Sequence, residues 1–113
     1  LRRVLGDPKL DDPVLEFGEL RLDTARRLVE RAGEAVALTR AEYEILEYLW
    51  RHNGKVLSKK QIADSYQRDP GADPRANSVE GLVGRIKRKI DPDKSLQPIE
   101  TVRGRGYLFR STP

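Results

Sequence analysis

The chain has 113 residues, which suffice for one ordinary domain and are too few for two. Apolar residues make up 37% of it and charged residues 35%, and the absence of cysteine excludes disulfides and thiolate metal sites. The single histidine excludes a His-rich metal centre, and nothing in the sequence predicts a cofactor. No apolar run approaches the roughly 18 residues of a membrane span, and no signal peptide is recognisable.

Positive charge is concentrated in the last third of the chain. Residues 1–73 carry 13 basic and 14 acidic side chains, whereas residues 74–113 carry 9 basic and 4 acidic ones. A basic region on an otherwise balanced domain is typical of a protein that binds a polyanion. A solvated, lysine-rich face is the alternative, and charge alone does not separate the two.

The N-terminal part predicts a linker followed by a small sheet. Residues 1–13 end in the acidic, proline-containing GDPKLDDP, which is typical of a linker, and the start at Leu1 rather than Met suggests a piece of a longer protein. The domain itself is expected over residues 14–113. Short apolar segments separated by turn residues predict an antiparallel meander of four strands. These segments are Val14–Phe17, Leu20–Leu22, Leu28–Arg31 and Ala35–Leu38.

Two capping boxes predict the first two helices. Ser or Thr followed three residues later by Glu or Gln occurs in TRAE from Thr39 and in SKKQ from Ser58. The first helix is expected to end near Gly54, which suits the left-handed position after a helix. The second is expected to be short, reaching about Tyr66, and to be followed by a loop over residues 67–76, which contain two prolines and a glycine.

A third capping pattern, with Asn77 as cap and Glu80 at the third helical position, predicts a helix that runs to about Ile90, where Asp91-Pro92 stops it. At about 100° per residue, five apolar side chains share one face within roughly 60° of Val79. They are Val79, Leu82, Val83, Ile86 and Ile90. The opposite face holds Asn77, Gly81, Gly84 and Arg88, with Arg85 about 60° from its centre and Lys87 beside the apolar stripe.

Glycine on the exposed face of this helix calls for an explanation. Each mid-helix glycine costs about 1 kcal/mol relative to alanine, and a solvated face would be better served by Glu, Lys or Gln. We interpret Gly81 and Gly84 as positions where a partner approaches the backbone, with Arg85, Lys87 and Arg88 binding that partner. The DNA major groove, about 12 Å wide, admits such a helix. Close packing of another helix against the glycines is the alternative.

The C-terminal segment predicts a hairpin with a basic tip. Ile99–Arg103 and Tyr107–Arg110 are strand-like, and Gly104-Arg105-Gly106 forms the turn between them. Arginines on a thin loop, here Arg103 and Arg105, suit the narrow minor groove of A·T-rich DNA.

Four motifs together resemble a known family. LTRAEYEIL, GKVLSKKQI, NSVEGLVGRIKRKI and IETVRGRGYLF occur in this order, and the chain resembles the effector domain of OmpR/PhoB-type response regulators from about Leu15 to Arg110. The resemblance implies an α+β winged helix-turn-helix with an N-terminal four-stranded antiparallel sheet, three helices and a C-terminal β-hairpin wing. It implies a cytoplasmic two-component phosphorelay protein that binds double-stranded DNA and controls transcription, with its N-terminal receiver domain missing from this chain.

The resemblance also implies roles for individual residues. The recognition helix would be residues 77–90 in the major groove, and the wing would be residues 103–106 in the minor groove, entered by Arg103. Ser78, Arg85, Lys87 and Thr101 would contact phosphates, with Arg85 also reaching bases. The loop 66–76, including Asp69, Asp73 and Arg75, would contact RNA polymerase. The isolated domain would be monomeric, and two copies would bind direct repeats head to tail.

This sequence departs from the family pattern on the recognition helix. Gly81 and Gly84 stand where relatives usually carry larger residues, and Leu82 replaces a common histidine or tyrosine, so base preference cannot be transferred.

Other functions are weaker fits. A protein-interaction module could use the winged helix or the acidic first helix, with Glu42, Glu44 and Glu47, and would show little salt-dependent affinity for DNA. RNA binding normally needs more aromatic stacking residues than Tyr107 and Phe109 provide. An enzyme is the weakest reading, since no nucleophile–base pair, apolar carboxylate dyad or Gly-rich phosphate loop is recognisable.

Overall fold

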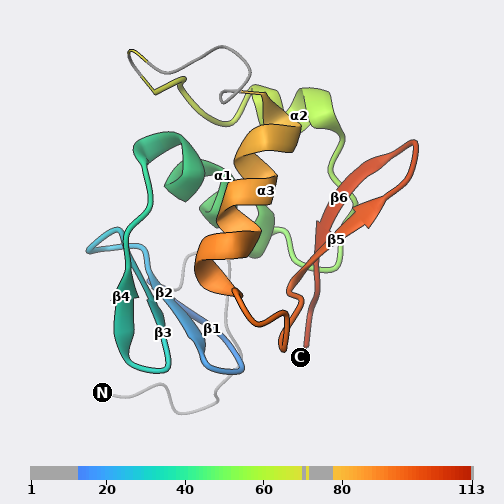
Figure 1. Ribbon diagram of the computed structural model, residues 1–113. Coiled ribbons are helices and arrows are strands. Elements are labelled where there is room, and N and C mark those ends of the chain that lie inside the picture. Colours follow the sequence, from blue (N-terminus) through green and yellow to red (C-terminus); the bar gives the residue numbers. More distant parts are fainter. Residues whose placement is uncertain (1–12, 70, 72–77, 113) are drawn as a thin grey trace.

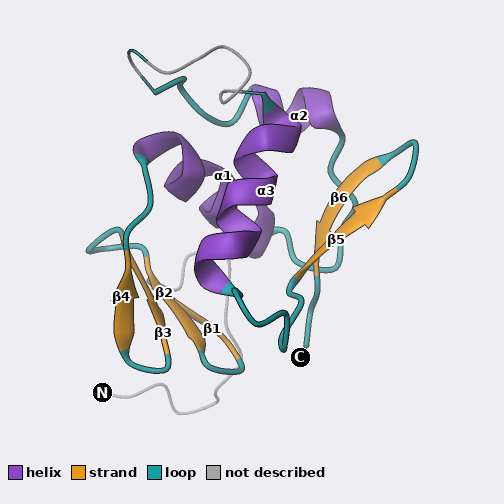
Figure 2. Cartoon of the chain, viewed as in Figure 1, coloured by secondary structure: helices purple, strands orange, loops and turns teal. Residues whose placement is uncertain are grey.

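The computed structural model of the chain describes residues 13–69, 71 and 78–112. A four-stranded sheet comes first, followed by three helices and a two-stranded hairpin (Figure 1, Figure 2), which confirms the predicted α+β fold. Within these ranges, no helix is long and apolar enough to span a membrane. The elements are β1 (Val14–Phe17), β2 (Leu20–Asp23), β3 (Leu28–Arg31), β4 (Glu34–Val36), α1 (Arg40–Arg51), α2 (Lys59–Ala63), α3 (Val79–Ile90), β5 (Ile99–Val102) and β6 (Gly106–Phe109).

The N-terminal sheet is an antiparallel meander in the order β1-β2-β3-β4, as predicted. Its last strand begins at Glu34, one residue earlier than expected, and ends at Val36 instead of Leu38. The cause is the tight turn of Ala32 and Gly33, which both have positive φ (53° and 85°) and pair Arg31 directly with Glu34. Of the predicted linker over residues 1–13, only Pro13 lies within the described residues.

The predicted caps of α1 and α2 are confirmed, including both hydrogen bonds of each capping box. The predicted end of α2 at Tyr66 is wrong, because the helix ends at Ala63. The Ser65 hydroxyl donates to the Ile62 carbonyl at 2.6 Å, which takes an acceptor that a continuing helix would use.

The cap of α3 is Ser78 rather than the predicted Asn77, which lies outside the described residues. The Ser78 hydroxyl accepts a hydrogen bond from the Gly81 amide at 3.0 Å. With Ser78 as cap, the third helical position falls on Gly81, which has no side chain to reach back. Glu80 instead forms an ion pair with Lys59 of α2. The apolar stripe is confirmed, since all five predicted residues are buried.

Phe109 of β6 joins the sheet, α1 and the hairpin in one core. Its ring stacks on Trp50 of α1 with centroids 4.6 Å apart, and it meets Phe17 of β1 edge-on at 5.3 Å. β6 also contacts the segment before α2, where Leu57 and Tyr107 exchange two backbone hydrogen bonds of 2.8 and 2.9 Å. These contacts fix the hairpin relative to the helices, so the hairpin stands beside α3 (Figure 1).

The C-terminal end of α3 is anchored to the sheet by Arg31 of β3. Its guanidinium donates to the Ile90 carbonyl at 2.7 Å and to the Asp91 carboxylate at 3.2 Å. Asp91 is buried and also accepts the backbone amides of Leu96 and Gln97. One cation therefore satisfies the end of the helix and, through Asp91, orders the loop that leads to β5.

Candidate nucleic-acid interface

The exposed part of α3 divides into an outer face and two flanks. The outer face consists of Gly81, Gly84 and Arg88, the inner flank of Arg85 and Lys89 beside α1, and the wing flank of Glu80 and Lys87 beside α2 and β5.

The outer face is open at Gly84. A methyl group added there would meet only the Arg88 Nη1 atom within 4 Å, at 3.6 Å, apart from the helix's own nearby backbone. The alternative that another helix packs against Gly84 is therefore wrong for the described residues. Gly81 is partly exposed and Arg88 is exposed on the same face. A partner can therefore come close to the backbone of α3 at Gly84, and the positively charged Arg88 lies one turn further along the helix.

The inner flank is held by a buried carboxylate. Glu42 of α1 has no solvent exposure, and its Oε2 accepts the Arg85 Nε–H at 2.9 Å. Its Oε1 accepts Lys89 Nζ at 2.7 Å and the Thr39 amide at 2.9 Å. Arg85, expected from the sequence to bind the partner, is thus engaged by α1, and its side chain is 27% exposed.

Glu42 keeps its charge at neutral pH. Burial by itself raises the pKa of Glu42, but hydrogen bonds from the two cations and from the Thr39 amide outweigh it, so the pKa lies below its ordinary value. This role could not be predicted from the sequence, because the capping box alone explained why a glutamate stands at this position. Glu42 is also no part of an acidic surface, contrary to its place in the interaction-module alternative.

The wing flank links α3 to its neighbours through polar side chains. Lys87 Nζ donates to the Thr101 hydroxyl of β5 at 3.3 Å, which brings together two residues predicted to contact phosphates. Glu80 is paired with Lys59 of α2. Lys59, Glu80 and residues 101–107 line a groove of about 600 Å³, which is therefore formed by α2, the first turn of α3 and the hairpin.

The hairpin presents its two arginines at the tip, as predicted. β6 starts at Gly106, one residue earlier than expected, so the turn consists of Arg103, Gly104 and Arg105, all exposed. The Arg105 amide donates to the Val102 carbonyl at 2.9 Å and closes the turn. The two guanidinium groups therefore sit on a narrow projection beside the groove.

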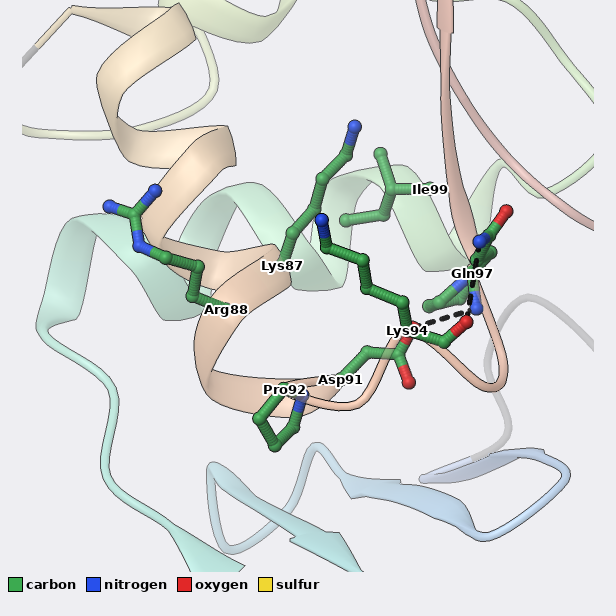
Figure 3. A pocket seen from close by; sticks show the side chains of 8 residues that line it. Lys87, Arg88, Asp91, Pro92, Lys94, Gln97 and Ile99 are labelled. Carbon is green, nitrogen blue, oxygen red and sulfur yellow. Dashed lines mark hydrogen bonds between the residues drawn. The ribbon is translucent and has the colours of Figure 1, made fainter.

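A pocket of about 320 Å³ adjoins the C-terminal end of α3 and adds a cation that sequence reasoning missed (Figure 3). Lys87, Arg88 and Lys94 line it together with the apolar residues Pro98 and Ile99. Figure 3 shows the Lys87 and Lys94 side chains near each other, with Arg88 directed away from both. Lys94 lies in the loop after α3 with positive φ (57°), a conformation that is uncommon for lysine and that no local sequence pattern predicted.

The predicted polymerase-contact residues are only partly placed. Asp69 is partly buried, and its carboxylate accepts the Ala41 amide in the first turn of α1 at 3.1 Å. Asp73 and Arg75 lie outside the described residues, as does Asn77. The Asp69 carboxylate therefore binds the start of α1, so the residue has a structural contact besides any predicted contact with RNA polymerase.

Comparisons with known proteins agree with this geometry. Residues 33–109 match the family described as "Transcriptional regulatory protein, C terminal". The chain is 45% identical over 96 residues to the two-component response regulator PhoP of Pseudomonas aeruginosa, covering 84% of this chain and 42% of PhoP. It therefore spans less than half the length of that relative.

Two solved structures match nearly end to end. The DNA-binding domain of CpxR from E. coli gives a TM-score of 0.71 at 29% identity, covering 89% of this chain and 99% of that one. The Klebsiella pneumoniae RstA DNA-binding domain, solved in complex with the RstA box, gives 0.70 at 31% identity and covers 86% and 96%. The chain belongs to the family of C-terminal transcriptional regulatory domains, as a winged-helix effector domain of the OmpR/PhoB type.

Proposed function

We propose that this domain binds double-stranded DNA sequence-specifically and controls transcription as the effector part of a two-component response regulator. α3 would enter the major groove with its outer face, and the hairpin tip, residues 103–106, would enter the adjacent minor groove. The observation that carries the proposal is the open backbone at Gly84 with cations at the end of α3 and on the hairpin beside it. Family membership and the DNA-binding domains among the similar structures support it.

The proposed contacts fall into two groups: contacts to phosphates position the domain on the DNA, and contacts to base edges read the sequence. Ser78 caps α3, and its hydroxyl would contact a phosphate at the positive end of the helix dipole. Lys87 and Thr101 would hold a second phosphate, with Lys94 nearby. The outer face would read base edges. The full proposed set is Asn77, Ser78, Gly81, Gly84, Arg85, Lys87, Arg88, Thr101, Arg103 and Arg105, with Lys94 added from the structure.

The assembly and the cellular context are proposed from the family resemblance. We infer that the isolated domain is monomeric, that two copies bind a direct repeat head to tail, and that a receiver domain precedes residues 14–113 in a cytoplasmic protein. The loop 66–76, with Asp69, Asp73 and Arg75, is the candidate contact with RNA polymerase. The names of PhoP, a two-component response regulator, and of the RstA DNA-binding domain support the response-regulator and DNA-binding parts of this proposal, whereas the assembly and the polymerase contact rest on the family resemblance.

The interaction-module alternative has less support. Of the three carboxylates that would make an acidic surface on α1, Glu42 is buried. Glu44 is paired with Arg40 at 3.2 Å, and Glu47 with Arg51 at 3.2 Å. An acidic partner-binding surface would need its carboxylates exposed.

Salt dependence separates the two functions. Neutralising four to six phosphates predicts that the logarithm of the association constant falls against the logarithm of salt concentration with a slope of about −4 to −5. We expect this slope in fluorescence anisotropy with a labelled duplex of mixed sequence. No binding to the duplex at low salt would contradict the proposed function and favour the interaction module.

The hairpin assignment is tested by Arg103→Ala. We expect it to weaken binding to a specific site by about tenfold or more and to flatten any preference for A·T pairs beside that site. Dissociation constants on duplexes with A·T or G·C flanks measure both effects. Arg26→Ala, which removes one exposed positive charge in the turn between β2 and β3, is the control. Unchanged affinity and preference in Arg103→Ala would remove the wing from the interface.

A further inference from the structure

The inner flank of α3 contains a polar contact that the proposed function does not explain. Glu42 contacts Arg85 and Lys89, which stand one turn apart on α3, and both of its oxygens are used. A carboxylate without solvent exposure is costly to bury unless it is fully paired, and replacing such a group by apolar packing is often neutral or stabilising. Because apolar packing could hold the two helices together equally well, we expect this contact to have a further role.

We propose that Glu42 is a positioning residue for DNA binding, which orients the Arg85 guanidinium before DNA arrives. This inference rests on the proposed function, since it concerns how one residue of that interface is prepared. Arg85 lies about 60° from the centre of the outer face, at its border with the inner flank. Its side chain is partly exposed, so the border reaches the surface that would face DNA.

The carboxylate is itself firmly held. The Thr39 amide donates to Glu42 Oε1, and the Glu42 amide donates to the Thr39 hydroxyl at 3.2 Å, which locks the side chain to the first turn of α1. A guanidinium is planar and rigid, so an acceptor at Nε restricts the plane in which all its N–H groups lie. Ordering a long side chain lowers affinity when it occurs on binding, and here that ordering is already present in the free domain.

Lys89 is the natural comparison within the same cluster. It contacts the other oxygen of Glu42 at 2.7 Å, and it lies about 100° from the centre of the outer face. Its single ammonium carries no fixed plane to orient. If Glu42 only joins the helices, its replacement should leave the contribution of Arg85 to specific DNA binding unchanged; if Glu42 positions Arg85, that contribution should fall.

The Glu42→Gln variant keeps the shape of the side chain but removes its charge and replaces one acceptor oxygen with a donor. Glutamine can complete a capping box, so the cap of α1 is retained when its amide oxygen faces Thr39. The amide nitrogen then takes the place of Oε2 and meets the Arg85 Nε–H as donor against donor. We expect a folded protein with about tenfold lower affinity for a selected specific duplex and nearly unchanged affinity for a duplex of mixed sequence.

A double-mutant cycle shows whether Glu42 acts through Arg85. In an Arg85→Met background, Glu42→Gln is expected to cause no further loss of specific affinity. Lys89→Met is expected to reduce the salt slope by no more than about one and to keep the ratio of specific to mixed-sequence affinity. Thermal unfolding by circular dichroism accompanies each variant.

Three results would overturn the inference. They are an unchanged affinity ratio in Glu42→Gln, a loss that persists in the Arg85→Met background, and equal losses in Arg85→Met and Lys89→Met. If Glu42→Gln is unfolded at the assay temperature, the cycle is measured at a lower temperature at which the variant is folded, and equal losses in Arg85→Met and Lys89→Met still overturn the inference. Failure of the wild-type domain to bind any duplex would instead contradict the proposed function, so the two failures are distinguishable.

Discussion

Replacing Gly84 with glutamate is expected to lower specific DNA affinity by at least about a hundredfold while the domain stays folded. The position is open, since only Arg88 Nη1 lies within 4 Å of an added Cβ. Glutamate is a good helix former, so the helix itself gains up to about 1 kcal/mol relative to glycine. Its carboxylate would stand where α3 meets the DNA, adding bulk and a repulsive charge toward phosphates. Fluorescence anisotropy and thermal unfolding measure the two expectations.

Gly84→Gln and Gly84→Ala are the matched controls for this experiment. Glutamine has the same size without the charge, and alanine adds only the methyl group that the site has room for. We expect alanine to stabilise the fold and to affect binding least. A folded, soluble Gly84→Glu domain that binds normally would mean that this side of α3 does not face the DNA.

Replacing Gly106 with alanine is expected to destabilise the domain by about 3 kcal/mol or more. Gly106 has φ of 144°, and a Cβ there would lie 1.9 Å from the Leu57 carbonyl oxygen and 2.8 Å from its carbon. That carbonyl cannot move freely, because it accepts the Tyr107 amide at 2.9 Å. Relief of the clash would pull β6 away from the segment before α2. In thermal unfolding we expect the midpoint to fall by about 10 °C or more.

Gly104→Ala supplies the comparison within the same hairpin. Gly104 also has positive φ (75°), but nothing lies within 4 Å of an added Cβ. Its substitution should cost only the left-handed backbone conformation, about 1–2 kcal/mol. Equal losses at the two positions would contradict the close approach of the hairpin to Leu57.

Local features of the sequence predicted most of the fold. The capping boxes at Thr39 and Ser58 are short-range hydrogen-bond patterns, and both were confirmed. The apolar stripe of α3 follows from helical periodicity, and it is buried as predicted. Each of these signals depends on residues within a few positions of one another, which is why it can be recognised without a structure.

Contacts between distant residues could not be predicted in the same way. Glu42 pairs with Arg85 and Lys89 across 43 and 47 residues, and its capping box already explained its presence in the sequence. The cap of α3 is Ser78 instead of the predicted Asn77, because Asn and Ser are both common capping residues and residue type alone does not choose between neighbours. Lys94 lines the pocket beside α3 from a loop residue with positive φ, a conformation that glycine usually marks and that the sequence therefore did not predict here.

Selection of bound duplexes from a randomised pool, at moderate salt and followed by sequencing, decides whether this domain reads DNA sequence. The proposed function predicts recovery of a motif of about 6–8 base pairs, repeated once per helical turn, as expected for two copies bound head to tail. Recovery of unselected sequence alone would contradict sequence-specific binding, leaving non-specific electrostatic attraction as the only affinity of this domain for DNA.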